Sequence, residues 1–318
     1  MSAQSKTFPA VPSSASEKAA PARLAVMAAF LSTYLIWGST YLAIWYAVAS
    51  IPPLYTAGFR HAISGSILLA AALMKGQRPT WPQLKASVVI GFFFFLVGHG
   101  TLHWAETQVP TGLASLLIAS EPIWVFLLAS ASEKRWRMNG LLLAGVALGL
   151  GGVALLLGRD VWSAGRGVFL GAVACLVGAI SWSAGIIYSR RSHLSGSPLL
   201  LSALSLLAGS AMLLSTGTML GEYRGFHFRD VTTRSWLGLA YLIVFGSVIA
   251  FTAYNWLLEH YSPTLVATHT YVNPIVAVLL GWWLAGEHIS FNVLIAAGMV
   301  IVAVFLVDRG LARLKTSD

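Results

Sequence analysis

The chain has 318 residues, of which 57% are hydrophobic and 10% are charged. Soluble domains carry about 25% charged residues, so this composition excludes an ordinary soluble protein. The net charge of +9 would suit a nucleic-acid surface only if the basic residues were clustered, and they are spread along the chain.

Ten apolar runs follow one another along the sequence, and each is long enough to cross a hydrocarbon core of about 30 Å as a helix. They lie near residues 24–48, 54–74, 86–106, 110–131, 139–157, 166–188, 198–220, 236–258, 264–284 and 290–308. The sequence therefore predicts an all-α integral membrane protein with ten transmembrane helices.

The basic residues indicate how these runs are oriented. If the N-terminus is cytoplasmic, cytoplasmic segments hold fourteen of the 20 Lys and Arg, the opposite side holds five, and Arg60 lies inside a run. This asymmetry predicts that both termini are cytoplasmic. Residues 1–23, rich in Ala, Ser and Pro, are expected to form a disordered tail, and residues 309–318 a second cytoplasmic tail. The charge reflects topology, and no nucleic-acid partner is expected.

The two halves of the chain repeat each other. Matched pairs recur in the same order: Trp37 with Trp182, Pro53 with Pro198, Trp104 with Trp256, and Glu121-Pro122-Ile123 with Asn273-Pro274-Ile275. Each half, 24–157 and 166–308, holds five runs, so the second half enters the membrane from the other side and is inverted. Inverted repeats around a midplane site are the architecture of many secondary transporters.

Three segments carry a resemblance to a known family. LIWGSTYLAIWYAVASIPPLYTAGFRHAISG resembles the opening of an EamA-type repeat of the drug/metabolite transporter superfamily. SLLIASEPIWVFLLASASEKRW and THTYVNPIVAVLLGWWLAGEHIS resemble the fourth span and following loop of the two repeats. The resemblance implies a ten-helix inner-membrane carrier, usually an exporter of metabolites, amino acids or toxic compounds. It also implies a central cavity lined by the first, third and fourth helices of each half.

Glu121 is the most informative residue, because it puts a carboxylate in the middle of the run 110–131. Intramembrane charges are costly and usually face a polar cavity or a partner. Glu121 could bind a proton or a cationic substrate, or it could be a structural hydrogen-bond partner between helices. Its counterpart Asn273 is uncharged. Pro122 is expected to kink the helix beside Glu121, with Pro274 as its structural counterpart.

Further polar side chains lie in predicted spans. His99, His103 and Glu106 share one helical face by their spacing, either as a stripe facing a cavity or as bonds between helices. The flanking HGTLHWAE is not the HExxH pattern, and no metal or cofactor is expected. Arg60 could attract an anionic group or pair with Glu121, but it is expected to be structural, with its side chain extending to the outer interface. His269 and Tyr271 lie close to the Asn273-Pro274 pair. Like His99 and His103, they could either face a cavity or form bonds between helices.

Aromatic residues make up 12% of the chain. Many are expected at the membrane interfaces. Those on helices that the resemblance places around the cavity could instead bind flat or cationic organic molecules by stacking and cation–π attraction. These candidates are Trp37, Tyr41, Trp182, Tyr188, Tyr254 and Trp256.

The sequence lacks the motifs GxxxxGK[ST], CxxC and GxSxG, so neither an ATP-driven pump nor a common enzyme class is indicated. It predicts a non-enzymatic secondary transporter that exports a small organic solute across the inner membrane, as a monomer or homodimer in the lipid bilayer. Proton antiport and substrate-gradient uniport or import remain alternatives, as do an intramembrane enzyme or a sensor.

Overall fold

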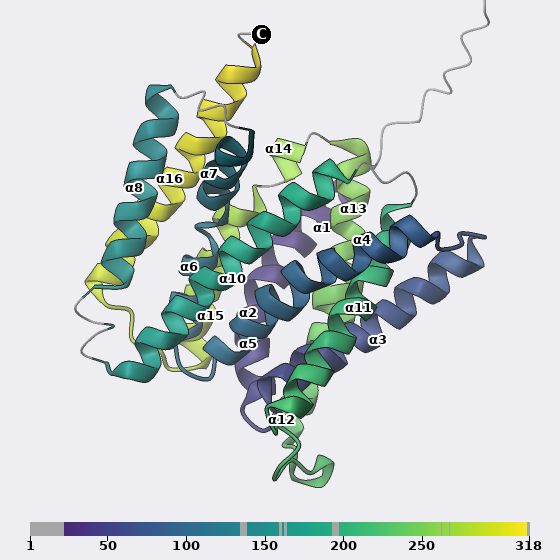
Figure 1. The fold of residues 1–318 in the computed structure, drawn as a ribbon. Coiled ribbons are helices and arrows are strands. Elements are labelled where there is room, and N and C mark those ends of the chain that lie inside the picture. The colour runs from purple at the N-terminus through teal and green to yellow at the C-terminus, as the bar shows by residue number, and fades with distance from the viewer. Residues whose placement is uncertain are drawn as a thin grey trace, which may run out of the picture.

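Figure 1 shows the computed structural model of the chain, which describes residues 22–133, 139–158, 161, 164–192, 197–261, 263–266 and 268–316. Within these ranges every regular element is a helix, as predicted, and there is no strand. The predicted N-terminal tail falls almost wholly outside the described residues, as does the basic loop at 134–137.

The first half contains α1 (Arg23–Leu31), η1 (Ser32–Ile36), α2 (Trp37–Val48), α3 (Pro53–Met74), α4 (Trp81–Gly91), η2 (Phe92–His99), α5 (Gly100–Ala105), α6 (Thr111–Ile118), α7 (Glu121–Glu133) and α8 (Gly140–Leu156). The second half contains α10 (Arg166–Arg191), α11 (Pro198–Met219), η3 (Phe228–Asp230), α12 (Thr233–Tyr241), η4 (Leu242–Ile249), α13 (Ala250–His260), α14 (Pro263–Val266), α15 (His269–Leu284) and α16 (Phe291–Thr316).

Eight helical stretches of the described chain are long and apolar enough to cross a membrane. They are Arg23–Val48, Pro53–Met74, Trp81–Ala105, Thr111–Ser132, Arg166–Arg191, Pro198–Met219, Thr233–Leu257 and Phe291–Arg313. The two other predicted spans correspond to shorter helices, α8 with 17 residues and α15 with 16. Helix α15 begins at His269, and the short helix α14 before it ends at Val266.

Local sequence signals begin several helices. Proline occupies the first position of α3 and of α11, where the missing amide costs nothing. Thr80 and Gln83 form a reciprocal capping box at the start of α4. The Asn139 side chain accepts a hydrogen bond from the Leu142 amide at the start of α8.

The halves pack in a crossed manner. Helix α3 lies along α11 and α8 along α16, forming two pairs at opposite edges of the array (Figure 1). Between these pairs, α2 packs on α12 and α15 of the second half, while α10 packs on η2 and α7 of the first half. The first, third and fourth spans of each half therefore meet at the centre.

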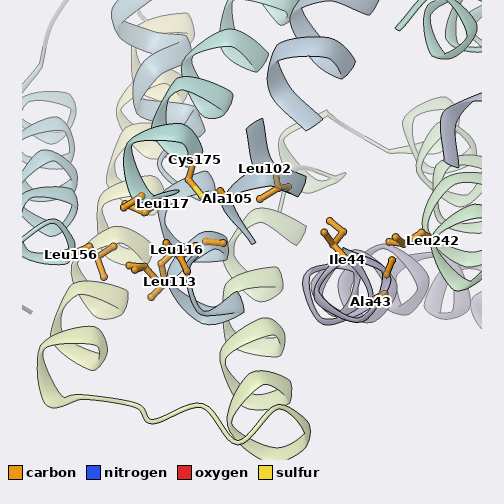
Figure 2. Packing of buried hydrophobic residues seen from close by; sticks show 14 of the residues in the cluster. Ala43, Ile44, Leu102, Ala105, Leu113, Leu116, Leu117, Leu156, Cys175 and Leu242 are labelled. Atoms are coloured by element: carbon orange, nitrogen blue, oxygen red, sulfur yellow. The ribbon is translucent and has the colours of Figure 1, made fainter. Parts of the chain in front are cut away.

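The largest buried cluster surrounds the turn between α5 and α6. Figure 2 shows Leu102, Ala105, Leu116 and Leu117 packed with Cys175 of α10. Cys175 is fully buried and packs as a small residue in this cluster. Small residues let these helices approach closely, and interhelical packing of this kind is the main source of association between helices in lipid.

Three spans contain π-helical segments, namely η1, η2 and η4. The segments η2 and η4 lie at nearly equivalent places in the third span of each half, since most matched residues of these spans stand 152 positions apart. A π-helical turn widens the helix and disturbs the regular hydrogen-bond ladder, and such turns are frequent at functional sites.

Candidate functional site

Trp37 of α2 is the centre of a first aromatic group. Its Nε1 donates a hydrogen bond to the backbone carbonyl of Gly246 in η4, 3.0 Å away. Its ring centroid lies 5.1 Å from that of Tyr254 and 4.8 Å from that of His269. Tyr254 and His269 also contact each other, edge to face, at 5.7 Å. These three predicted residues are thus brought together from α2, α13 and α15.

Trp182 of α10 is the centre of a second aromatic group. Its ring stacks on Phe94 with centroids 4.3 Å apart and on His99 with centroids 5.1 Å apart. Phe95 meets the same indole edge-on at 6.2 Å. Trp182 and His99 were both predicted as site residues, whereas Phe94 was not.

The two groups are related by the internal repeat. Gly246, the partner of Trp37, and Phe94, the partner of Trp182, stand 152 positions apart, which is the offset of the matched residues in the third and fourth spans. In each half, the tryptophan of the first span therefore contacts the π-helical segment of the other half.

Glu121 lies where the fourth span is interrupted. Helix α6 ends at Ile118 and α7 begins at Glu121. Pro122 stands in the first turn of α7, where a proline is tolerated, and the two turn residues Ala119 and Ser120 lie directly before that helix. The Glu121 side chain is half-buried, and its backbone carbonyl accepts a hydrogen bond from Ser183 Oγ of α10 at 3.2 Å.

Two tyrosines lie near the Glu121 carboxylate. Tyr41 of α2 and Tyr254 of α13 are both close enough to interact with it electrostatically. Tyr254 also belongs to the Trp37 group, so the carboxylate and the first aromatic group lie in one region. Interrupted helices at the middle of the membrane are a common way for carriers to present polar groups to a ligand.

Asn273, the counterpart of Glu121, is engaged by backbone groups. Its amide nitrogen donates to the carbonyl oxygens of Tyr34 and His269, each at 3.0 Å. Tyr34 in turn bonds Thr268 through the two hydroxyl groups at 2.6 Å. Asn273 therefore ties η1 to the start of α15. Pro274 lies inside α15 and is buried.

The predicted histidine stripe is joined by a histidine that sequence reasoning missed. His99 Nδ1 lies 2.8 Å from Nε2 of His61 in α3, and the rings are stacked. The Nδ1 of His103 bonds the backbone carbonyl of His99 at 2.7 Å, so it must carry the proton. The sequence offered one signal for His61, namely its position beside the intramembrane Arg60.

Arg60 does not extend to the interface, and that prediction is wrong. Its side chain is only 5% exposed, and Nε donates to Ser247 Oγ of η4 at 3.0 Å. Gly246 leaves room for it, because a Cβ there would stand 3.3 Å from the guanidinium. The space and the hydroxyl come from the other half of the chain, which explains why the local sequence did not reveal them.

Three predicted residues lie apart from the central groups in the described structure. The Trp256 ring contacts His260 of its own helix at 4.5 Å. Tyr271 bonds Asp308 of α16 and packs against Ala119. Tyr188 is half-buried, and no ring contact joins it to either Trp37 or Trp182.

The chain has relatives across bacteria and plants. The profile of the EamA-like transporter family matches residues 24–158 and 169–308. The uncharacterized inner membrane transporter YedA of Escherichia coli K12 is 36% identical over 296 residues, which cover 90% of this chain and 92% of YedA. The uncharacterized transporter YoaV of Bacillus subtilis is 24% identical and covers 91% of this chain and 99% of its own length.

More distant similarities agree with this picture. A WAT1-related chloroplast protein of Arabidopsis thaliana is 27% identical over 87% of this chain and 68% of its own length. A solved crystal structure matches with a TM-score of 0.62 at 21% identity, covering 92% of this chain and 100% of that one, and therefore shares the fold.

Proposed function

Because the chain belongs to the EamA-like transporter family, we propose that it is a secondary carrier that exports small organic solutes across the inner membrane. The family profile matches both halves, and the relatives YedA and YoaV are described as transporters. In this proposal ten segments cross the membrane, with α8 and α15 as the two short ones, and both termini are cytoplasmic.

The crossed tryptophans are the observation that supports alternating access. Trp37 bonds η4 of the second half, and Trp182 stacks on η2 of the first half. Two similar halves that hold each other through equivalent contacts can exchange conformations, and the exchange exposes a central site to each side in turn. The aromatic groups, Tyr41 and Glu121 line that site in our proposal.

The chemistry of the central residues favours flat or cationic organic solutes. Indole and phenol rings attract cations through their faces, and they stack on flat molecules. A half-buried carboxylate at Glu121 adds one negative charge to this aromatic surface. We propose that Glu121 binds either the cationic group of the solute or the proton exchanged for it, which would make the carrier a proton antiporter.

The experiment is a comparison of export. Secreted metabolites and resistance to cationic dyes are compared between cells that lack the protein and cells that overproduce it. Compounds whose secretion or tolerated concentration falls in cells that lack the protein and rises in cells that overproduce it are selected. These compounds are then loaded into proteoliposomes containing the purified protein. Efflux that requires the protein would support the proposal, whereas no protein-dependent efflux for any such compound would contradict it. Efflux unaffected by a pH gradient would identify a uniporter.

A further inference from the structure

Glu106, directly after α5, is buried without a partner. Its side chain is 2% exposed, and neither carboxylate oxygen has a hydrogen-bond partner in the part of the chain that the structure describes. The backbone of Trp45 in α2 lies near the carboxylate, and neither oxygen is hydrogen-bonded within the described residues. The hydroxyl of Thr111, at the start of α6, is fully buried and likewise lacks a partner among the described residues.

A second carboxylate lies within electrostatic range of Glu106. Glu287 reaches α6 from the segment before α16, and it interacts electrostatically with Glu106. Its Oε1 accepts a hydrogen bond from the Thr111 amide at 2.6 Å, and its Oε2 accepts one from the Gly112 amide at 3.2 Å. Glu287 is therefore held in place by the first turn of α6, with lone pairs left over on both oxygens.

Gly281 of α15 lets these oxygens pack directly against its backbone. A Cβ at this position would stand 2.5 Å from Glu287 Oε2 and 2.6 Å from Thr111 Oγ1. Both oxygens thus converge on the same side of Gly281, where any larger residue would collide with them. The Glu287 carboxylate and the Thr111 hydroxyl therefore lie together, and Glu106 adds a second carboxylate within electrostatic range of Glu287. Glu106 directly follows Ala105, whose packing Figure 2 shows.

The charges around this group do not balance. The titratable neighbours of Glu106 are Glu287, Tyr41 and Cys175, and none of them is cationic. His103 lies one turn earlier on the same helix. Helix α3 carries two further basic side chains, His61 and Arg60. The Nε of Arg60 donates its hydrogen bond to Ser247 and not to Glu106. Burying an ion without a compensating charge is strongly unfavourable, so the Glu106 carboxylate requires a cation or a proton in this position.

We propose that Glu106, Glu287 and Thr111 form a binding site for a small monovalent cation, either a proton or Na⁺, at the turn between α5 and α6. Oxygen ligands of this kind suit hard cations, and a proton on Glu106 would neutralise the same charge. The site is separate from Glu121, which lies one helix further along the chain. If the bound cation drives solute transport, that role rests on the carrier function proposed above. Cation binding itself does not depend on the carrier function.

The test is made on the purified full-length protein in detergent, with Na⁺ and the proton as separate probes. Thermal unfolding is measured at increasing NaCl, with choline chloride keeping the ionic strength constant. For the proton, the infrared carbonyl band of a protonated carboxyl group is followed with pH in choline buffer. We expect either a saturable rise in Tm with Na⁺ or a protonated carboxyl band, and Glu106→Gln should remove whichever is present.

Two further variants keep the test decisive. Thr111→Val, which retains the backbone amide bonded by Glu287, should weaken a Na⁺ response about tenfold or more, the loss typical for a removed ligand or its support. This variant also serves if Glu106→Gln does not fold. Glu222→Gln removes a different carboxylate that also caps a helix, and it should leave the response of Glu106 unchanged.

The outcomes separate the two proposals. If neither Na⁺ nor the carboxyl band distinguishes the wild type from Glu106→Gln and Thr111→Val, the cation site is refuted. A cation response without any solute flux in proteoliposomes would refute the carrier function and leave the cation site in place. Solute flux without a cation response would refute the cation site and leave the carrier function in place.

Discussion

Trp37 donates a hydrogen bond from its indole nitrogen to the backbone carbonyl of Gly246, and this bond crosses the boundary between the two halves of the chain. The acceptor lies in the π-helical segment η4, where the regular ladder of backbone bonds is disturbed. The bond therefore serves two purposes, since it satisfies a backbone group inside the membrane and fixes the orientation of an indole ring in the central aromatic group.

We predict that Trp37→Phe destabilises the protein by about 1 kcal/mol, because it keeps an aromatic ring but leaves the Gly246 carbonyl without its donor. The expected fall in Tm is about 2 °C, measured by thermal unfolding in detergent. Trp45→Phe is the matched control, since Trp45 lies on the same helix and is 36% exposed. Equal effects of the two substitutions would show that the bond contributes nothing.

Gly38→Ala should destabilise the contact between α2 and α15. A Cβ at residue 38 would lie 2.6 Å from the Val276 Cβ and 3.1 Å from the Asn273 carbonyl oxygen, so the helices must separate. Overpacking of this kind costs about 1–3 kcal/mol. Gly298→Ala in α16, where nothing lies within 4 Å, is the control and should be neutral or stabilising. Restored stability in Gly38→Ala with Val276→Ala would confirm the steric cause.

Glu121→Gln should abolish transport driven by a pH gradient while leaving expression and folding intact. Gln has the size and hydrogen-bonding capacity of a protonated Glu but cannot ionise. Exchange of solute without net proton movement should survive. Asn273→Ala is the comparison, because it removes the uncharged counterpart and should leave the pH dependence in place. A wild-type rate and pH profile in Glu121→Gln would identify the residue as a structural contact.

Glu222 should make stability depend on pH. Burial raises its pKa above the usual carboxyl value, opposed by hydrogen bonds from the amides of Leu54 and Tyr55. The folded state then holds this proton more tightly than the unfolded state, so the contribution of Glu222 to stability falls as pH rises from the usual carboxyl pKa through the raised one.

The Glu222 effect is measured as Tm against pH. Glu222→Gln, which retains one acceptor for the two amides, should flatten the curve in that range. Asp230→Asn, an exposed change in the same loop, should leave it as in the wild type. A curve in Glu222→Gln that follows the wild type throughout would contradict the assignment.

The proposed orientation predicts the outcome of reporter fusions. Fusions after residues 78 and 191 and at the C-terminus should report the cytoplasm, because the flanking segments carry most of the Lys and Arg residues. Fusions near residue 228 should report the outer side. Figure 1 places the segment before α12 and the end of α16 at opposite ends of the array, which the fusions should reproduce. A C-terminus on the outer side would contradict the ten-span arrangement.

The sequence was most informative about what repeats along the chain. Apolar runs predicted the helices, and the pairs Trp37 with Trp182 and Glu121 with Asn273 predicted an internal repeat. The family profile confirms two EamA repeats, whereas their inverted orientation stays a prediction. The turn at Ala119 and Ser120 was anticipated only as a kink at Pro122, because hydropathy stays high through this stretch. A run of apolar residues predicts that a segment lies in lipid, but it does not predict where the backbone hydrogen bonds of the helix are interrupted.

The contacts between distant residues were beyond sequence reasoning. Arg60 was assigned to the interface from its span alone, but its partner Ser247 comes from the other half. His61 was overlooked because the resemblance places the first, third and fourth helices of each half around the cavity, whereas its ring in the second lies against that of His99. Glu106 was placed on a helical face with two histidines, and its neighbour Glu287 could not be identified without the fold.

The bond between Arg60 and Ser247 has a consequence for biogenesis. Arg60 leaves the ribosome 187 residues before the serine that it binds. Until the segment containing η4 has been inserted, the guanidinium of α3 has no partner from the second half and stays costly to hold in lipid. The first half therefore cannot reach its final packing during its own synthesis. Assembly of the two halves is a late, coupled event, although each half is a complete repeat in sequence.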